Sequence, residues 1–430
     1  MPLYCTAPPL PFLLSSMVRR ILQNFATRFA TALLSFAIVW FTARYLGASG
    51  RGAVSLFTTD CAALLLFTGL VGGSSLIYLS PKRSIWHLLP PAYVWAVVVC
   101  IAGTLAVGLL RPVPITYLGH LGALSLLQAF FTINTLLLLG RKRETTYNFL
   151  TVLQVTLLAG CLLLAFAGLA WREVPVYYYA TYVAYGIPLL LSFIALSRLP
   201  DRWAGGQGLR ETTRELAQNG RGAHLSNILA FANYRLSYYF VAHYVDAHAV
   251  GVLSVGVALA EAVWLIPRST ALVQYVDLVH ATDKQAQVAP ALGVARLSLL
   301  ATGAGVLTLS LLPASVFMAV FGPEFGAARS VIILLAPGVL AIASNIMCST
   351  YFSGLGQYRT NNISTALGLA VTVPACWLLI PKLGIQGAAL ASSLSYLASM
   401  AYLLRAFGHA TGTGVEALLP NRTDLQRVTQ

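Results

Sequence analysis

Long apolar runs follow one another along almost the whole chain, and short polar segments separate them. Each run holds about 20 residues or more, which is the length that an α-helix needs to cross a bilayer core of roughly 30 Å. The runs end at Gly, Pro or charged residues, and they predict helices over residues 20–44, 53–80, 88–110, 114–139, 147–170, 175–197, 221–244, 249–275, 293–320, 328–353, 360–381 and 385–407. The predicted fold class is an all-α polytopic membrane protein with twelve transmembrane helices.

The composition agrees with a membrane protein. Hydrophobic residues make up 58% of the chain and charged residues only 9%, whereas soluble domains carry about 25% charged residues. The six cysteines are scattered, and neither a CxxC pair nor a Cys/His cluster with metal spacing occurs. We therefore expect no disulfide, no metal site and no cofactor.

The basic residues indicate the orientation. Most of the 27 Lys and Arg residues fall in the loops on one side of the predicted membrane, and basic loops mark the cytoplasmic side. This bias places both termini in the cytoplasm. The net charge of +14 then reflects topology and attraction to anionic lipid, and nucleic acid is not an expected partner.

Two pairs of similar segments indicate an internal repeat. ARYLGASGRGAVSL (43–56) resembles AHYVDAHAVGVLSV (242–255), and LGRKRETT (139–146) resembles LGQYRTNN (355–362) in the same order. We predict an N-lobe over 17–197, a cytoplasmic linker over 198–220, a C-lobe over 221–407 and a cytoplasmic tail over 408–430. The Pro-rich residues 1–16 are expected to be a non-native or disordered extension, with Met17 as an alternative start.

The first predicted helix carries a polar stripe. Its members share one face of an α-helix: Asn24, Thr27, Arg28, Thr31 and Ser35. A charge at bilayer depth costs roughly 2.5–3.5 kcal/mol on insertion scales, so such residues usually face a cavity or a partner. We expect the stripe to line a cavity, while the alternative is that Ser and Thr bond their own helix or a neighbouring one.

Four intramembrane charges are the main candidates for function. Arg28 and Asp60 lie in the first two predicted helices, and Arg235 and Glu261 lie in the seventh and eighth. The predicted substrate-binding or cavity residues are Arg28, Arg235, Asn24, Thr27, Thr31, Asn227 and Tyr238. The predicted coupling or gating residues are Asp60 and Glu261.

Depth in the membrane suggests how these charges pair. At 1.5 Å per residue, Arg28 and Glu261 lie about 12 and 14 Å from the cytoplasmic end, and Asp60 and Arg235 both about 20 Å. We therefore expect the cross-lobe pairs Arg28–Glu261 and Arg235–Asp60, which form and break as the lobes rock. Permanent ion pairing with a structural role is the alternative.

The charges also suggest a class of substrate. Guanidinium groups match phosphate oxygens in bidentate geometry, so two arginines in a cavity favour an anionic substrate. The two carboxylates are candidates to carry a coupling H⁺ or Na⁺. The basic loops 141–143 and 198–221 offer a second place to hold a diphosphate headgroup, although topology alone explains them.

Four motifs resemble one family. ARYLGASGRGAVSLF, FGPEFGAARSVIILLAPGVL (321–340), SGLGQYRTNNISTALGL (353–369) and IPKLGIQGAALASSLSY (380–396) are similar to the Wzx-type polysaccharide flippases of the MOP exporter superfamily, which also includes MATE drug exporters and lipid II flippases. The resemblance implies two six-helix lobes with helices 1, 2, 7 and 8 around a central cavity. It also implies export of undecaprenyl-diphosphate-linked oligosaccharide by alternating access.

Three functions compete at this point. The first is a flippase for lipid-linked oligosaccharide in exopolysaccharide, capsule or O-antigen synthesis, with a polysaccharide polymerase and a chain-length regulator as partners. The second is a MATE-like cation-coupled exporter of drugs or metabolites. The third is a membrane polymerase or ligase, but the chain has neither a large external loop nor a nucleophile–base set, so we do not expect an enzyme.

Overall fold

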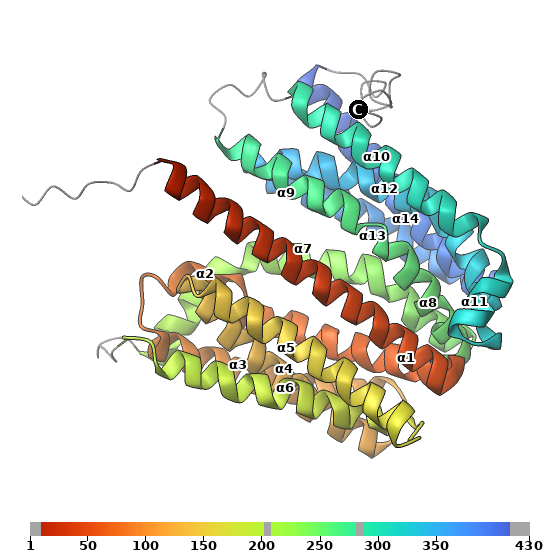
Figure 1. Cartoon of the computed structure of the whole chain (residues 1–430), viewed down its shortest axis with the longest axis horizontal. Helices are drawn as coiled ribbons and strands as arrows, with labels where there is room; N and C mark the ends of the chain where they lie inside the picture. Colours follow the sequence, from red (N-terminus) through yellow and green to blue (C-terminus); the bar gives the residue numbers. More distant parts are fainter. Residues whose placement is uncertain (1–9, 202–207, 281–287, 413–430) are drawn as a thin grey trace, which may run out of the picture. The chain divides into compact units, whose positions relative to one another are not determined.

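The structure, a computed structural model, describes residues 10–201, 208–280 and 288–412. All the regular elements in these ranges are helices, as predicted (Figure 1). They are α1 (Leu10–Gly72), α2 (Ser74–Leu79), α3 (Ile85–Leu110), α4 (Ile115–Gly140), α5 (Glu144–Leu163), α6 (Val174–Ser197), α7 (Leu209–Tyr244), α8 (Ala247–Ala262), α9 (Leu265–His280), α10 (Val288–Leu311), α11 (Ala314–Phe321), α12 (Ala328–Gly354), α13 (Tyr358–Leu383) and α14 (Ile385–Thr411). A π-helical turn (Leu164–Gly168) extends α5, and a 3-10 turn (Pro323–Ala327) precedes α12.

The helices form two compact units. Unit 1 comprises Met1–Ile38, Thr68–Trp171 and Pro175–Asn219, and unit 2 comprises Val39–Phe67, Arg172–Val174 and Gly220–Gln430. The helical hairpin at Val39–Phe67, which the sequence assigns to the N-lobe, therefore packs with the C-terminal half of the chain. The long helices α1 and α7 both pass from one unit into the other.

Unit 1 is built around α4, against which α2, α3 and α5 pack. Leu121, Leu124 and Leu137 of α4 are fully buried. A buried polar chain joins three helices, because Tyr93 Oη of α3 donates to Asn134 Oδ1 of α4 over 2.7 Å, and Asn134 Nδ2 donates to Ser192 Oγ of α6 over 2.9 Å. In an apolar bundle such hydrogen bonds fix which helix faces meet.

Unit 2 has a core of small and β-branched residues. The helices α13 and α14 lie side by side, and α12 packs on α14 (Figure 1). Asn233 of α7 ties α7 to both α13 and α14, because its Oδ1 accepts from Thr372 Oγ1 and Ser395 Oγ, each over 2.6 Å. Asn233, Thr372 and Ser395 are all buried. Each of their three side-chain oxygens has a hydrogen-bond partner within this network.

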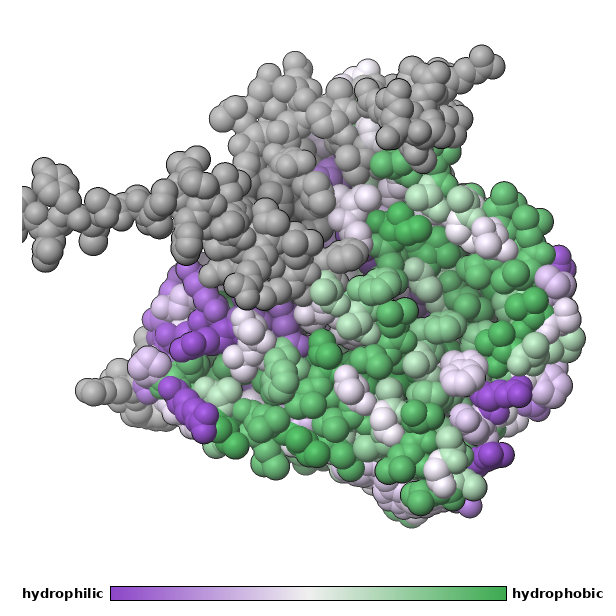
Figure 2. Space-filling model, in the orientation of Figure 1, coloured by the Kyte–Doolittle hydropathy of each residue, from purple (hydrophilic) through white to green (hydrophobic). Residues whose placement is uncertain are grey.

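The outer surface of the helices is apolar, as a bilayer requires. Figure 2 shows apolar side chains over a broad area, with polar side chains mainly at its margins. The exposed fractions of Leu109, Leu105 and Trp377 are 88%, 63% and 61%. Large side chains with such exposure belong to proteins that meet lipid or a partner.

In the described part of the chain, nine helices are long and apolar enough to cross a membrane, or ten if one bent pair counts as a single span. That pair is α10 and α11, which meet at an angle of 85° with Pro313 as the N-terminal cap of α11. The predicted count of twelve spans stays a prediction, as do the cytoplasmic termini.

Several predicted boundaries differ from the structure. The first two predicted helices form one element, α1, which is interrupted by nonhelical backbone at Gly47 (φ 69°, ψ −175°). The predicted eighth helix is broken between α8 and α9, and α7 begins at Leu209, inside the predicted linker. Of the predicted extension, residues 1–9 lie outside the described part and residues 10–16 begin α1; most of the predicted tail also lies outside it.

Replacing Asn233 by Ala removes the two hydrogen bonds that join α7 to α13 and α14, while Thr372 Oγ1 and Ser395 Oγ keep the carbonyl oxygen of Gly368 as an acceptor. A hydrogen bond contributes about 0.5–1.5 kcal/mol, so we expect a fall in the thermal unfolding midpoint of the purified protein. Asn227→Ala is the matched control, because Asn227 lies on the same helix and is exposed. Equal midpoints for Asn233→Ala and Asn227→Ala would contradict a stabilising role for the network.

Candidate functional site

An ion pair between α7 and α8 forms the centre of the site. Arg235 Nη1 and Nη2 donate to Glu261 Oε1 and Oε2, each over 3.1 Å. This parallel, bidentate arrangement is the strongest geometry for such a pair. The side chains are 33% and 25% exposed, so the pair is partly open rather than sealed in the core.

The ion pair lies next to a break in the helix. Glu261 occupies the last turn of α8, which ends at Ala262, and α9 begins at Leu265. A carboxylate in the last turn is unfavourable with respect to the helix dipole, and the guanidinium of Arg235 offsets this. Interrupted helices at membrane depth occur where the backbone is buried in protein or lines a water-filled cavity, and they mark binding sites in many transporters.

Aromatic rings enclose the ion pair on the side of the core. The ring centroids of Tyr234, Trp264 and Tyr396 lie 5.6 to 5.9 Å from one another. The ring of Tyr238 lies 5.6 Å from the guanidinium carbon of Arg235. Trp264 is 3% exposed, and its Nε1 has no hydrogen-bond partner among the described residues.

Arg268 adds a second positive charge near this wall. Its guanidinium carbon lies 5.7 Å from the centroid of the Trp264 ring, at a distance that allows a cation–π interaction. The residue is exposed. In the sequence, Glu261, Trp264 and Arg268 have the spacing of one helical face. Although the helix is broken between α8 and α9, Arg268 still lies next to Trp264.

Asp60 has a separate environment in unit 2. The Asp60 side chain is 1% exposed, and Tyr239 Oη donates to its Oδ1 over 2.8 Å. Tyr239 lies one helical turn after Arg235 on α7. A single stretch of α7 therefore supplies a partner to each of the two intramembrane carboxylates.

The predicted pairing of the charges is wrong for Arg235 and Glu261 in this structure, which bind each other within the C-terminal half. Counted from the α7–α8 hairpin, Arg235 and Glu261 differ in depth by roughly 7 Å along the helix axes. The prediction ranked this pair below the depth-matched pairs, because such an offset is within reach only of extended side chains. Two extended side chains cover the difference, so the depth of the Cα atoms alone does not decide which charges meet.

Arg28 and its neighbours belong to the part of α1 in unit 1, whereas Glu261 belongs to unit 2. Arg28 is exposed, and no hydrogen bond or ion pair of its side chain occurs among the described residues. Thr31 Oγ1 donates to the carbonyl oxygen of Thr27 over 2.8 Å, which is the bond within the helix that the alternative interpretation expects. Asn24 lies on α1, but its side chain falls outside the described residues.

The other predicted cavity residues occupy two different environments. Asn227 is exposed on α7. Tyr238 is only 5% exposed and belongs to the hydrophobic core of unit 2. Its buried ring packs beside the guanidinium of Arg235. A role for Tyr238 in lining a cavity stays a prediction.

Two aligned glycines of the internal repeat bring α1 and α8 into backbone contact. A Cβ atom added to Gly52 would lie 1.7 Å from the carbonyl oxygen of Ala247, and one added to Gly251 would lie 1.9 Å from that of Ala48. Each glycine follows an alanine by four residues, which is the small-residue spacing of close helix crossings in membranes. The repeat thus appears in space as a nearly symmetric contact within unit 2.

Glu324 stabilises the turn of α1 at Gly47. Its Oε2 accepts from the backbone N–H of Ala48 over 2.7 Å, and its Oε1 lies 3.5 Å from His248 Nε2. The carboxylate therefore caps the second half of α1 where the backbone turns at Gly47, and it touches the second hairpin as well. Sequence analysis missed this role, although Glu324 lies in the motif FGPEFG that carries the family resemblance.

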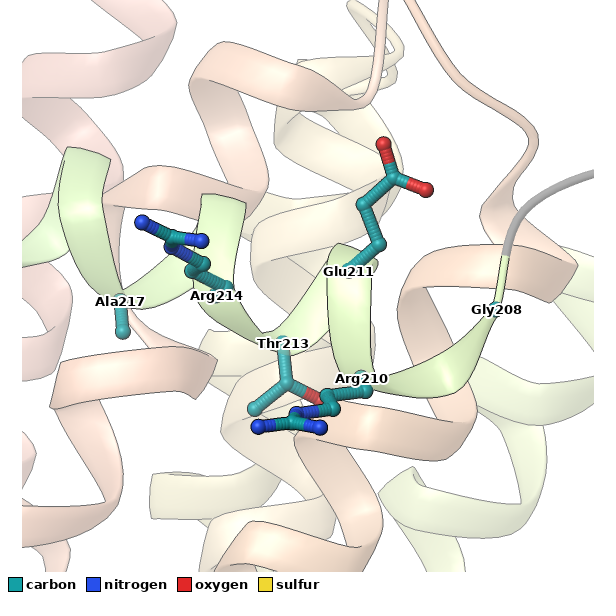
Figure 3. Close-up of a pocket in the computed structure, with 6 residues that line it drawn as sticks. All are labelled: Gly208, Arg210, Glu211, Thr213, Arg214 and Ala217. Atoms are coloured by element: carbon teal, nitrogen blue, oxygen red, sulfur yellow. The ribbon is translucent and has the colours of Figure 1, made fainter.

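A basic pocket lies at the start of α7, in unit 1. It has a volume of about 990 Å³, and Figure 3 shows Arg210 and Thr213 on one side of the helix and Glu211 on the other. Its lining residues are Gly208, Arg210, Glu211, Thr213, Arg214 and Ala217.

Part of the basic surface around this pocket holds the fold together. Arg83 pairs with Glu215, and Arg141 pairs with Asp201. These two arginines therefore already have carboxylate partners. In the predicted loops, Arg210 and Arg214 are the arginines that line the pocket.

Comparisons with known proteins establish the fold. No protein-family model matches the sequence, and no curated protein matches it. Three solved structures are similar to this chain. The lipid II flippase MurJ matches with a TM-score of 0.72 and 13% identity, and the match covers 95% of this chain and 90% of that chain. A multidrug resistance MATE family transporter of the MOP superfamily in an inward-facing conformation has a TM-score of 0.69 and 14% identity, with 89% of this chain and 94% of that chain covered; a MOP superfamily transporter from Pyrococcus furiosus has a TM-score of 0.58 and 14% identity, with 92% and 95% covered in the same order. The chain therefore has the fold of MOP superfamily transporters over nearly its whole length.

Replacing Gly52 by Ala tests the helix crossing. The new Cβ would overlap a backbone oxygen, and overpacking of this kind costs about 1–3 kcal/mol, so the thermal unfolding midpoint should fall. Gly69→Ala is the control, because no atom lies within 4 Å of its added Cβ and Ala favours a helix over Gly by roughly 0.5–1 kcal/mol. If both variants unfold at or above the wild-type midpoint, the close crossing does not exist.

Proposed function

We propose that the protein is a flippase that moves undecaprenyl-diphosphate-linked oligosaccharide across the bacterial inner membrane by alternating access. The product would enter exopolysaccharide, capsule or O-antigen synthesis. A polysaccharide polymerase and a chain-length regulator would act beside it. The proposal combines the transporter fold with the chemistry of the intramembrane arginines.

The observation that carries the proposal is the position of Arg235. A partly exposed guanidinium lies beside a broken helix in an otherwise apolar bundle. Guanidinium groups bind phosphate oxygens in bidentate geometry, so this position suits the diphosphate of a lipid-linked substrate. Arg28, which is exposed on a membrane helix in unit 1, is a second guanidinium candidate for binding an anionic substrate.

The similarity to MurJ supports a lipid-linked substrate, because that protein is a lipid II flippase. The motifs of the sequence that resemble Wzx-type flippases favour an oligosaccharide on the lipid. Of the tyrosines on one face of α6, Tyr182 and Tyr185 are partly exposed and are candidates to stack on sugar rings, whereas Tyr178 is buried.

A cation-coupled exporter on the same fold is the second candidate. The observation that favours it is the presence of two intramembrane carboxylates, Asp60 and Glu261, which could hold a cationic substrate or a coupling ion. The similar MATE transporter is described as a multidrug resistance protein. A cationic substrate would be repelled by Arg235 and Arg28, which is why we place this function second.

Arginine variants separate the two candidates. In cells that depend on the protein for surface glycan, we expect Arg28→Ala and Arg235→Ala each to reduce glycan export at least tenfold. Arg→Lys at either position should be nearly as damaging if bidentate contact with phosphate matters, because Lys offers a point charge without the planar fork.

Arg405→Ala is the matched control for these variants, since Arg405 is exposed at the end of α14. Membrane levels of all variants are compared by immunoblot. Normal export by both alanine variants would exclude diphosphate binding by these arginines. Unchanged glycan together with lost efflux of a cationic dye would favour the exporter.

A further inference from the structure

We propose that the anionic substrate and a proton bind together at the Arg235–Glu261 pair. The substrate's phosphate takes the place of Glu261 on Arg235, and the released carboxylate takes up a proton from water. This inference rests on the proposed function and adds the coupling ion to it. An O–H bond forms on the carboxylate, and the bond between that proton and its donor, a hydronium ion or a buffer acid in the solvent, breaks.

The geometry of the ion pair is the first step. Glu261 occupies both Nη atoms of Arg235, which form the edge that a phosphate would use for a bidentate contact. Arg235 is therefore not a free anion site in this structure. A phosphate that binds in the same manner has to displace the carboxylate.

The charge balance is the second step. Displacement leaves Glu261 close to an anion and without its cation, and a nearby like charge disfavours the ionised form of a carboxylate. Proton uptake by Glu261 removes both penalties. Because binding and protonation are linked, anything that favours one of them favours the other.

Two further guanidinium groups lie near the pair. Arg51 of α1 donates to Ser254 Oγ of α8 and interacts electrostatically with Tyr238. The titratable groups that interact electrostatically with Glu261 include Arg235, Tyr234 and Tyr238 of α7 and Tyr396 of α14. Tyrosines are neutral at physiological pH. Arg268 of α9, the second guanidinium, faces the ring of Trp264 and interacts with Tyr234, so it is in a position to assist the incoming phosphate.

Two features indicate that the site has a second arrangement. The helix break directly after Glu261 allows its side chain to move without unwinding α8. Trp264 Nε1 is buried and unpartnered among the described residues, and buried donors without a hydrogen-bond partner are rare in folded proteins. In the exchanged state this N–H has an acceptor available, either the phosphate or the carbonyl oxygen of protonated Glu261.

The experiment is calorimetric titration of the purified full-length protein in lipid nanodiscs with inorganic pyrophosphate. Titrations in buffers of different ionisation enthalpy count the protons taken up on binding. We expect wild type to take up between half and one proton more than Glu261→Gln. The affinity of wild type should fall more steeply between pH 6 and pH 8, and Glu261→Gln should bind about tenfold more tightly at pH 8. Glu173→Gln, an exposed carboxylate outside the site, should behave as wild type.

A measurement on wild type alone covers the case in which Glu261→Gln does not fold. Sulfate carries no titratable proton in this pH range, so any proton uptake on sulfate binding belongs to the protein. We expect uptake of half a proton or more. Sulfate binding without proton uptake would overturn the exchange.

The remaining outcomes distinguish the exchange from the proposed function. If Arg235→Gln abolishes pyrophosphate binding while wild type and Glu261→Gln agree in affinity and proton uptake, the exchange is wrong and the flippase proposal stands. Binding that survives Arg235→Gln places the anion elsewhere and also overturns the exchange. If wild type neither binds pyrophosphate nor exports glycan, the proposed function fails and the exchange fails with it.

Discussion

A charge inside an apolar helix bundle requires a partner, and the contact between Arg235 and Glu261 meets this requirement for two helices at once. The bidentate geometry holds α7 against α8 at the point where α8 ends. The rings of Tyr234, Trp264 and Tyr396 pack behind it. Breaking such a pair by removing one partner leaves an uncompensated charge, so the pair acts both as a structural contact and as a site that an anion of the right geometry can enter.

The contact between α1 and α8 does not depend on buried charge. Gly52 and Gly251 let two backbones touch, and Glu324 caps the turn at Ala48. These contacts depend on small size and on one hydrogen bond, rather than on buried charge. Tyr239, which bonds Asp60, links the hairpin of α1 to the same stretch of α7 that carries Arg235. The polar contacts of Asp60 and Glu261 thus converge on α7, while the close packing joins α1 and α8.

The sequence predicts the fold class well because bilayer thickness fixes helix length, and apolar runs of that length leave few alternatives. The aligned glycines of the two repeats also mark a real contact. The partner of Arg235 could not be predicted from depth, because long side chains cover several ångströms that Cα positions do not show. The cap by Glu324 joins residues 276 positions apart, and only the folded chain shows that they meet.

The central claim is that guanidinium groups in the membrane recognise a diphosphate. It is tested most directly in proteoliposomes that contain the wild-type protein and a polyprenyl-linked oligosaccharide, with the initial rate of translocation as the readout. The account predicts clearly faster translocation when the linkage is a diphosphate than when the same glycan is attached through a monophosphate. Equal rates for both lipids, or no translocation of either, would contradict it.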